Sequence, residues 1–194
     1  MPETYPPAVE WTTQLADQLD WHWNAQLRPR IEGLTDEEYL WEPVEGCWSI
    51  RPRGEARAGL AAGRGDVVLE ADYPDPDPAP VTTIAWRLAH LIVGVFGVRA
   101  AAHFGGPPVD LLTFDYAPTA DVALRQLDEA YAAWMAGVRR LRGAELARPS
   151  GRAEGAFGRF PMAALVLHIH REAIHHGAEI ALLRDLFARR ASQT

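Results

Sequence analysis

The sequence predicts an all-α protein, a four-helix bundle that forms one domain over residues 1–194. A length of 194 residues is within the range of a single domain with a sizeable core. Apolar side chains recur every three or four residues in four long segments, as amphipathic helices require. Between the first two segments, glycines and prolines break the pattern, which predicts an irregular insertion. With 48% hydrophobic and 23% charged residues, the composition excludes a disordered chain and a small disulfide scaffold.

The first helix is expected over residues 8–32, after the prolines at positions 6 and 7. Its apolar residues recur every four positions: Trp11, Leu15, Leu19, Trp23 and Leu27. His22 lies close to this stripe, so it is expected to face the core, more as a hydrogen-bonding residue than as a metal ligand. Pro29 is expected to kink the helix or to end it early, because proline lacks the N–H donor that a helix interior needs.

Glycines interrupt the apolar pattern from residue 33 onwards, and alternating prolines at 74–80 exclude a helix there. The Gly- and Pro-rich part, about 54–80, is interpreted as the insertion. The apolar residues at 67–69 predict a short strand, which a hairpin would pair with residues 48–50.

The other three helices have clearer boundaries. The second is expected from the N-cap Thr82 or Thr83 to about residue 103, and it is apolar on both sides, which indicates a buried helix. The third, over 119–143, has the 3-4-3-4 apolar spacing of a bundle seam. The fourth is expected to open with a proline and to run over 161–188. Their connections predict antiparallel neighbours, as in an up-down bundle or a near variant.

The fourth helix carries the residues that point to chemistry. Glu172 and His176 lie four positions apart on its core-facing stripe, where an unpaired charge would cost several kcal/mol. Two such groups on one helix face can share a metal ion, and His90, in the middle of the second helix, is the candidate third ligand. A buried polar network without metal is the alternative. A Glu-x-x-His step at 172–175 is typical of di-iron bundles, but no other helix offers a second one.

The remaining histidines and the single cysteine give weaker indications. His103 beside the glycine turn and His170 off the apolar stripe are both expected at the surface. Cys47 is interpreted as a small, half-buried side chain rather than a nucleophile. A lone cysteine cannot form an internal disulfide, which favours a reducing compartment.

Charge and hydropathy exclude two classes of partner. The net charge is −7, from 19 basic and 26 acidic residues, and no basic face suited to a nucleic acid is evident. The longest apolar run, residues 88–98, is too short for a bilayer, which needs about 20 residues. No basic segment followed by an apolar stretch begins the sequence, so we expect no secretory signal and a cytoplasmic protein.

Taken in order, several motifs resemble the DinB-like (DinB/YfiT) superfamily, whose members include metal-dependent four-helix bundles and bacterial thiol transferases. The motifs are Gly-Leu-Thr-Asp-Glu-Glu at 33–38, the Trp-Glu-Pro and Trp-Ser-Ile steps at 41–43 and 48–50, Leu-Ala-His-Leu at 88–91, and His-His-Gly-Ala-Glu-Ile at 175–180. The resemblance covers most of the chain apart from the insertion.

The resemblance implies a metal site and its ligands. The family's set, one histidine on the second helix and a His-x-x-x-His pair on the fourth, corresponds to His90, Glu172 and His176, so a glutamate replaces one histidine. Two histidines and a glutamate can hold Zn²⁺ or another divalent ion, such as Ni²⁺ or Mn²⁺. His168, one turn earlier, would be a further ligand or would orient the carboxylate. The family's glutamine is replaced by Glu179, which adds negative charge.

The resemblance also implies an activity. It implies a metal-dependent transferase or hydrolase for a small-molecule substrate, with His22 or His168 as the proton acceptor, and a homodimer. All basic residues are arginine, which indicates a GC-rich genome and makes a low-molecular-weight thiol such as mycothiol a plausible co-substrate by analogy. The alternative is a non-catalytic bundle that has lost the metal and binds a small ligand or a protein partner.

Overall fold

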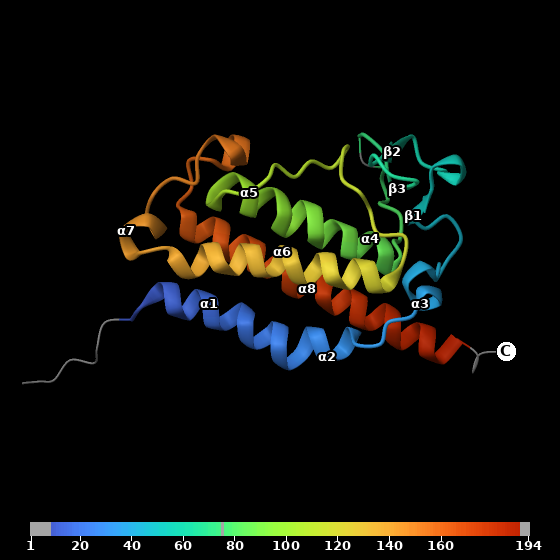
Figure 1. Ribbon diagram of the computed structural model, residues 1–194, viewed down its shortest axis with the longest axis horizontal. Coiled ribbons are helices and arrows are strands. Elements are labelled where there is room, and N and C mark those ends of the chain that lie inside the picture. The colour runs from blue at the N-terminus through green and yellow to red at the C-terminus, as the bar shows by residue number, and fades with distance from the viewer. Residues whose placement is uncertain (1–8, 75, 191–194) are drawn as a thin grey trace, which may run out of the picture.

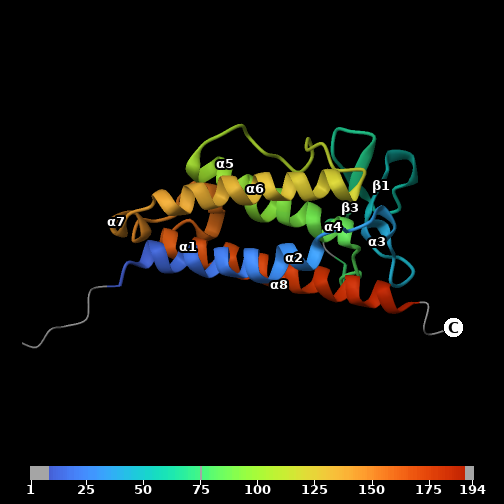
Figure 2. The same ribbon diagram turned by 60° about the horizontal axis from the view of Figure 1, so that its bottom comes forward.

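A computed structural model describes residues 9–74 and 76–190 (Figure 1). The chain is mostly helical, with one small three-stranded sheet, which confirms the predicted class in its coarse form. Four long helical segments lie side by side, and the sheet lies at one end of them (Figures 1 and 2). The prolines expected to start the first helix lie outside the described residues.

The first helical segment consists of α1 (Trp11–His22), a π-helical turn η1 (Trp23–Leu27) and α2 (Arg28–Ile31). Its expected stripe is buried except for Trp11. Pro29 does not end the helix early. The helical register widens just before the proline, and the helix continues to Ile31.

The excursion after the first segment holds α3 (Asp36–Leu40) and the sheet, in which β1 (Ile50–Pro52) and β2 (Leu60–Ala62) flank β3 (Val67–Ala71). Both pairs are antiparallel. The strand expected at 67–69 is present, and its partner begins at Ile50 rather than at 48. The local hairpin joins β2 to β3, whereas β1 pairs with β3 across the intervening chain.

Glu70 in β3 is fully buried and holds this excursion together. Its carboxylate accepts hydrogen bonds from the backbone N–H groups of Ser49 and Arg57 at 3.0 and 2.6 Å, and from Arg51 Nε at 2.8 Å. Its backbone carbonyl accepts from Trp86 Nε1 at 2.8 Å. The sheet is therefore fastened to the second helical segment through an indole.

The second segment consists of α4 (Ile84–Ala89), a π-helical stretch η3 (His90–Gly97) and α5 (Val98–Phe104), and Thr83 caps it as expected. Among the described residues it is the one helix long and apolar enough to cross a membrane, although more than half of its apolar window is buried by the rest of the chain. That burial accounts for its composition, because a core helix is apolar all round.

The last two long helices are α6 (Ala120–Arg140) and α8 (Met162–Arg189), with the short α7 (Gly143–Leu146) and η4 (Arg152–Phe157) between them. α6 runs parallel to α4–α5, which differs from the antiparallel expectation: the Phe104 ring, at the end of α5, packs against Gly137 near the end of α6. The physical reason is the link over residues 105–119. Fifteen extended residues span about 50 Å, more than the roughly 32 Å of the 21-residue α6, so the chain can return along the whole helix.

Candidate metal centre

His90 on η3 and the pair Glu172 and His176 on α8 converge where these two helices pack together. One ligand atom from each of the three lies within 4.8 Å of the others. His176 Nε2 is 3.5 Å from Glu172 Oε2, and the rings of His90 and His176 meet edge-on with centroids 4.7 Å apart. The structure thus brings together the three residues that the sequence singled out; that they bind a metal stays a prediction.

The position of the His90 ring is fixed from two sides. Trp86, one turn earlier, stacks on it at 5.5 Å between centroids. Gly94, one turn later, leaves room for it, because a Cβ there would lie 3.2 Å from His90 Nδ1. Burial, and next the neighbouring His176, lower the pKa of His90 to about 4. His90 is therefore neutral at pH 7, the form in which imidazole binds a metal.

His176 is oriented by a carboxylate on its far side. Its Nδ1 lies 2.6 Å from Glu179 Oε2, and Glu179 is itself 3.2 Å from Arg87 Nε. A carboxylate only accepts hydrogen bonds, so Nδ1 carries the proton and donates it. Nε2 then presents its lone pair towards Glu172. A carboxylate behind a ligating histidine is the usual arrangement around protein-bound metals.

The spacing of the three side chains fits a divalent metal. Ligand atoms about 2.1 Å from a tetrahedral zinc lie about 3.4 Å from one another. His176 Nε2 and Glu172 Oε2, at 3.5 Å, match this value. All three ligand atoms lie within 4.8 Å of one another, so the side chains would need only a small movement towards a shared ion. Two histidines and a glutamate are a donor set of catalytic zinc sites and leave a coordination position open.

A second group, His175, His176 and Glu179, has similar spacing but a poorer environment for a cation. Its carboxylate is paired with the Arg87 guanidinium, and its first histidine is exposed. A positive charge at Arg87 opposes a metal ion there and suits Glu179 to the role of orienting carboxylate.

The Glu179→Gln variant tests that role. Its amide can no longer hold the Nδ1 proton of His176 as a carboxylate does, so we expect zinc affinity to fall about 10- to 100-fold with the three ligands intact. Competition with a chromophoric chelator measures the affinity. The control is Glu129→Gln on the exposed face of α6, which should leave it unchanged. Equal affinity of Glu179→Gln and wild type would contradict the orienting role.

The two histidines expected to accept protons lie in different cavities. His168 Nδ1 is 3.6 Å from Glu172 Oε1, directly beside the triad of His90, Glu172 and His176. His22 instead lines a cavity of about 580 Å³ with Gly177 and Asp185. Burial lowers the pKa of His22, and its Nε2 has no hydrogen-bond partner among the described residues. Position therefore favours His168 over His22 for chemistry at the triad.

Two expectations about surface histidines are wrong. His170 is 1% exposed, and the His103 side chain is buried against Glu154, with His103 Nε2 2.8 Å from its carboxylate. The helix wheel took its inward direction from large apolar residues only. Ala173 and Gly177 are also buried on α8, and Gly177 lets Leu27 of η1 approach closely, which turns the buried arc towards His170.

His170 gives a stability prediction. Neither ring nitrogen has a partner within the described residues, and burial lowers its pKa to about 4. The His170→Leu variant removes two unsatisfied polar atoms at similar volume, so we expect it to raise the free energy of unfolding by about 1–3 kcal/mol.

The pH dependence follows from the same shift. Between pH 6.5 and 4 the unfolded chain binds a proton at this histidine and the folded chain does not, so wild-type stability falls as the pH falls through this range. Urea unfolding with a chelator present should show that the free energy of unfolding falls less between pH 7 and pH 5 in His170→Leu than in the wild type. His175→Leu, at an exposed position on the same helix, is the control. A destabilised His170→Leu would show that the imidazole is satisfied in solution.

Arg87 was missed by the sequence reasoning, although a signal existed. It lies three residues before His90, so both project from the same face of the second segment. Its guanidinium stands 3.4 Å from His176 Nδ1 and 3.2 Å from Glu179. Its position one turn before His90 could have predicted a positive charge close to the candidate metal ligands.

Comparison with known proteins gives the family. A search of curated proteins and a search of solved structures found no significant match. The family model of the DinB superfamily matches residues 18–180, most of the chain, and this match includes all three triad residues. The order of the sequence motifs, the long helices and the match agree: the chain belongs to the DinB superfamily.

Proposed function

We propose that this protein is a metal-dependent transferase or hydrolase that acts on a small molecule, with His90, Glu172 and His176 holding a divalent ion. The observation that carries the proposal is the convergence of three ligand atoms from two helices within 4.8 Å. Membership of a generally metal-binding superfamily supports it. Zinc, nickel and manganese all suit imidazole and carboxylate ligands, so the identity of the ion is left to experiment.

The bound ion would lower the pKa of a thiol or a water and so supply a nucleophile at neutral pH. The protein's own groups would prepare the site. The low pKa of His90 keeps its imidazole neutral, and Glu179 holds the Nδ1 proton of His176. His168, beside Glu172, is placed to donate a proton from Nε2, since its Nδ1 accepts from Arg171. We propose a low-molecular-weight thiol, such as mycothiol, as co-substrate.

Elemental analysis of the purified, untagged protein tests the metal site. We expect about one equivalent of zinc, nickel or manganese, and a rise in melting temperature when the ion is returned after chelation. Thiol-conjugation and hydrolase screens with metal-loaded and chelated protein then test the activity. A protein that takes up no ion even from excess would overturn the proposal.

A second candidate is a non-catalytic helical protein in which these groups form a polar network. The observation in its favour is that Glu172 already has polar partners: Arg171 Nε lies 3.7 Å from Oε1, and His168 Nδ1 lies 3.6 Å from it. This candidate predicts no thermal shift with Zn²⁺, Ni²⁺ or Mn²⁺. A chelator that lowers the melting temperature by several degrees would exclude it.

We further propose that the four long helices form a DinB-type bundle within one domain, with residues 54–80 as an insertion, and that the protein works in the cytoplasm as a homodimer without nucleic-acid or membrane partners. Light scattering during gel filtration tests the dimer. A monomeric mass at micromolar concentration would contradict it.

A further inference from the structure

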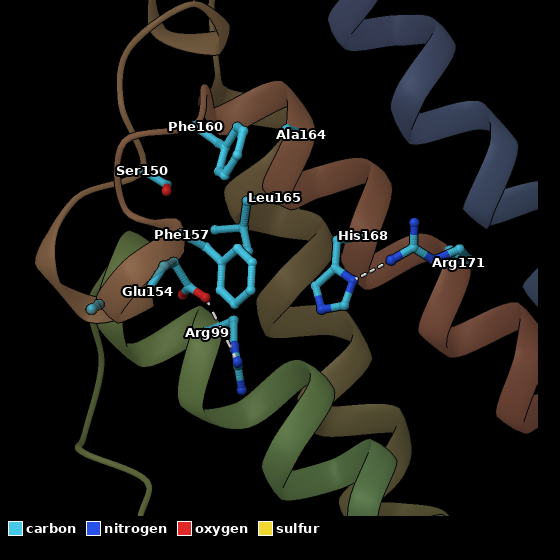
Figure 3. Close-up of a pocket in the computed structure, with 10 residues that line it drawn as sticks. Arg99, Ser150, Glu154, Phe157, Phe160, Ala164, Leu165, His168 and Arg171 are labelled. Carbon is cyan, nitrogen blue, oxygen red and sulfur yellow. Dashed lines mark hydrogen bonds and ion pairs between the residues drawn. The ribbon is translucent and has the colours of Figure 1, made fainter.

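A cavity of about 500 Å³ lies between α5, α8 and the loop that contains η4 (Figure 3). A volume of this size suits a small organic ligand. Its main lining side chains are Arg99, Phe157, Phe160, Leu165, His168 and Arg171.

The cavity adjoins the triad at two points. His168 in its wall is 3.6 Å from Glu172 Oε1. On the opposite wall Arg99 donates through Nη1 to the backbone carbonyl of Gly94, the residue that packs against His90. A molecule in this cavity therefore lies next to both helices that carry the triad.

The charges in the wall are already balanced. Arg99 Nη2 lies 3.6 Å from the buried Glu154 carboxylate, which also engages His103 at 2.8 Å. Arg171 Nε lies 3.7 Å from Glu172. Each arginine thus has a carboxylate within 4 Å, and an anionic ligand would gain little from either one. The arrangement favours an uncharged ligand.

The apolar lining favours a flat ring. Phe157 is 71% exposed and Phe160 44%, and their stacked rings stand 6.3 Å apart at the cavity, with Leu165 between them in the view of Figure 3. Neighbouring exposed phenylalanines on a soluble protein indicate a surface that binds an apolar partner. Aromatic walls hold aromatic ligands with more free energy than the buried area alone provides.

His168 offers a hydrogen-bond donor to such a ligand. Arg171 Nη2 donates to His168 Nδ1 at 2.6 Å, and because arginine only donates, Nδ1 is the acceptor. With Nδ1 accepting, the ring proton is on Nε2, at the ring edge turned towards Phe157 (Figure 3). An oxygen that only accepts, such as a carbonyl, matches this group.

We propose that this cavity binds an uncharged aromatic compound whose carbonyl oxygen accepts a hydrogen bond from His168 Nε2. The binding stands on the cavity alone; that the compound is the substrate rests on the proposed function. The proposal gives that function its substrate class, an aromatic carbonyl compound without a carboxylate.

Three naphthalenes of similar size test the chemistry: 2-acetylnaphthalene, 2-ethylnaphthalene and 2-naphthoate, each titrated into the metal-loaded protein by calorimetry. We expect the ketone to bind about fivefold more tightly than the ethyl compound, because only the ketone accepts the hydrogen bond. The carboxylate should bind most weakly. Equal binding of ketone and ethyl compound, tightest binding of the carboxylate, or no saturable binding would overturn the proposal.

Variants locate the binding. Phe157→Ala should weaken ketone binding about tenfold, while Leu182→Ala, at an exposed apolar residue of the cavity beside His22, should not. His168→Leu should abolish the preference for the ketone over the ethyl compound. A larger effect of Leu182→Ala, or an unchanged preference in His168→Leu, would overturn it.

Glu172→Ala separates this proposal from the proposed function. Ketone binding that persists in this variant supports the cavity even if no metal or activity is found. If ketone binding is lost in Glu172→Ala but unchanged in Phe157→Ala, the ligand binds at the triad instead. That result would overturn the cavity assignment.

Discussion

Replacing His176 with alanine is expected to abolish stoichiometric metal binding, whereas replacing His175 with alanine is expected to leave it intact. Removal of a residue that only orients a ligand costs about 10- to 100-fold in affinity, so loss of the ligand itself should cost at least about 100-fold. His175 is the neighbouring imidazole on the same helix, but its side chain is 64% exposed and lies outside the triad. Metal content after dialysis against buffered zinc measures both variants.

His90→Ala distinguishes the two possible clusters. The group of His175, His176 and Glu179 does not include His90, so metal binding there would survive this substitution and fail in His175→Ala. Binding at the triad predicts the reverse. Retention of a full equivalent in His176→Ala would exclude both groups, because His176 belongs to each. Circular dichroism should confirm that every variant is folded.

Arg51→Ala is expected to destabilise the protein by about 3–5 kcal/mol, the usual cost of leaving one charge of a buried ion pair without its partner. Glu70, 1% exposed at its side chain, would keep two backbone donors but lose the only cation within 4 Å of it among the described residues. Urea unfolding followed by tryptophan fluorescence measures the change in the free energy of unfolding.

Arg57→Ala is the matched control. Its side chain is 62% exposed and pairs with Glu42, which Arg51 also contacts, so its loss should cost less than about 1 kcal/mol. Glu70→Gln in the Arg51→Ala background should restore part of the stability, because the neutral amide needs no cation. A loss in Arg51→Ala no greater than in Arg57→Ala would contradict the importance of the buried pair.

The sequence predicted the helical class and the pairing of Glu172 with His176 because both follow from local spacing. Glu172 and His176 project from one face of one helix whatever the rest of the chain does. His90 was added as a candidate from its place among apolar residues in the middle of the second helix, and the resemblance then supported it, since nothing in the spacing says which part of the second helix meets the fourth. The parallel course of α6 depends on a loop, and loop length alone allows either direction.

Buried charges were the hardest features to predict. Val68, Leu69 and Glu70 are all buried, because β3 is the central strand and both its faces are covered, so the alternation that identifies an inward position is absent. In the sequence, a buried glutamate in such a strand cannot be distinguished from a solvent-exposed one. The burial of His170 likewise depends on small residues that a hydrophobicity pattern does not weigh.

Trp86 connects the sheet to His90 in a way that bears on the metal affinity of the proposed centre. Its indole nitrogen is held by the Glu70 carbonyl in the sheet, and its ring face lies against His90. An imidazole already confined in one orientation loses less conformational entropy when it acquires a ligand, so preorganisation by the sheet would strengthen metal binding at the proposed centre. Mutations in the strands would therefore weaken the centre by loosening His90, with every coordinating atom still present.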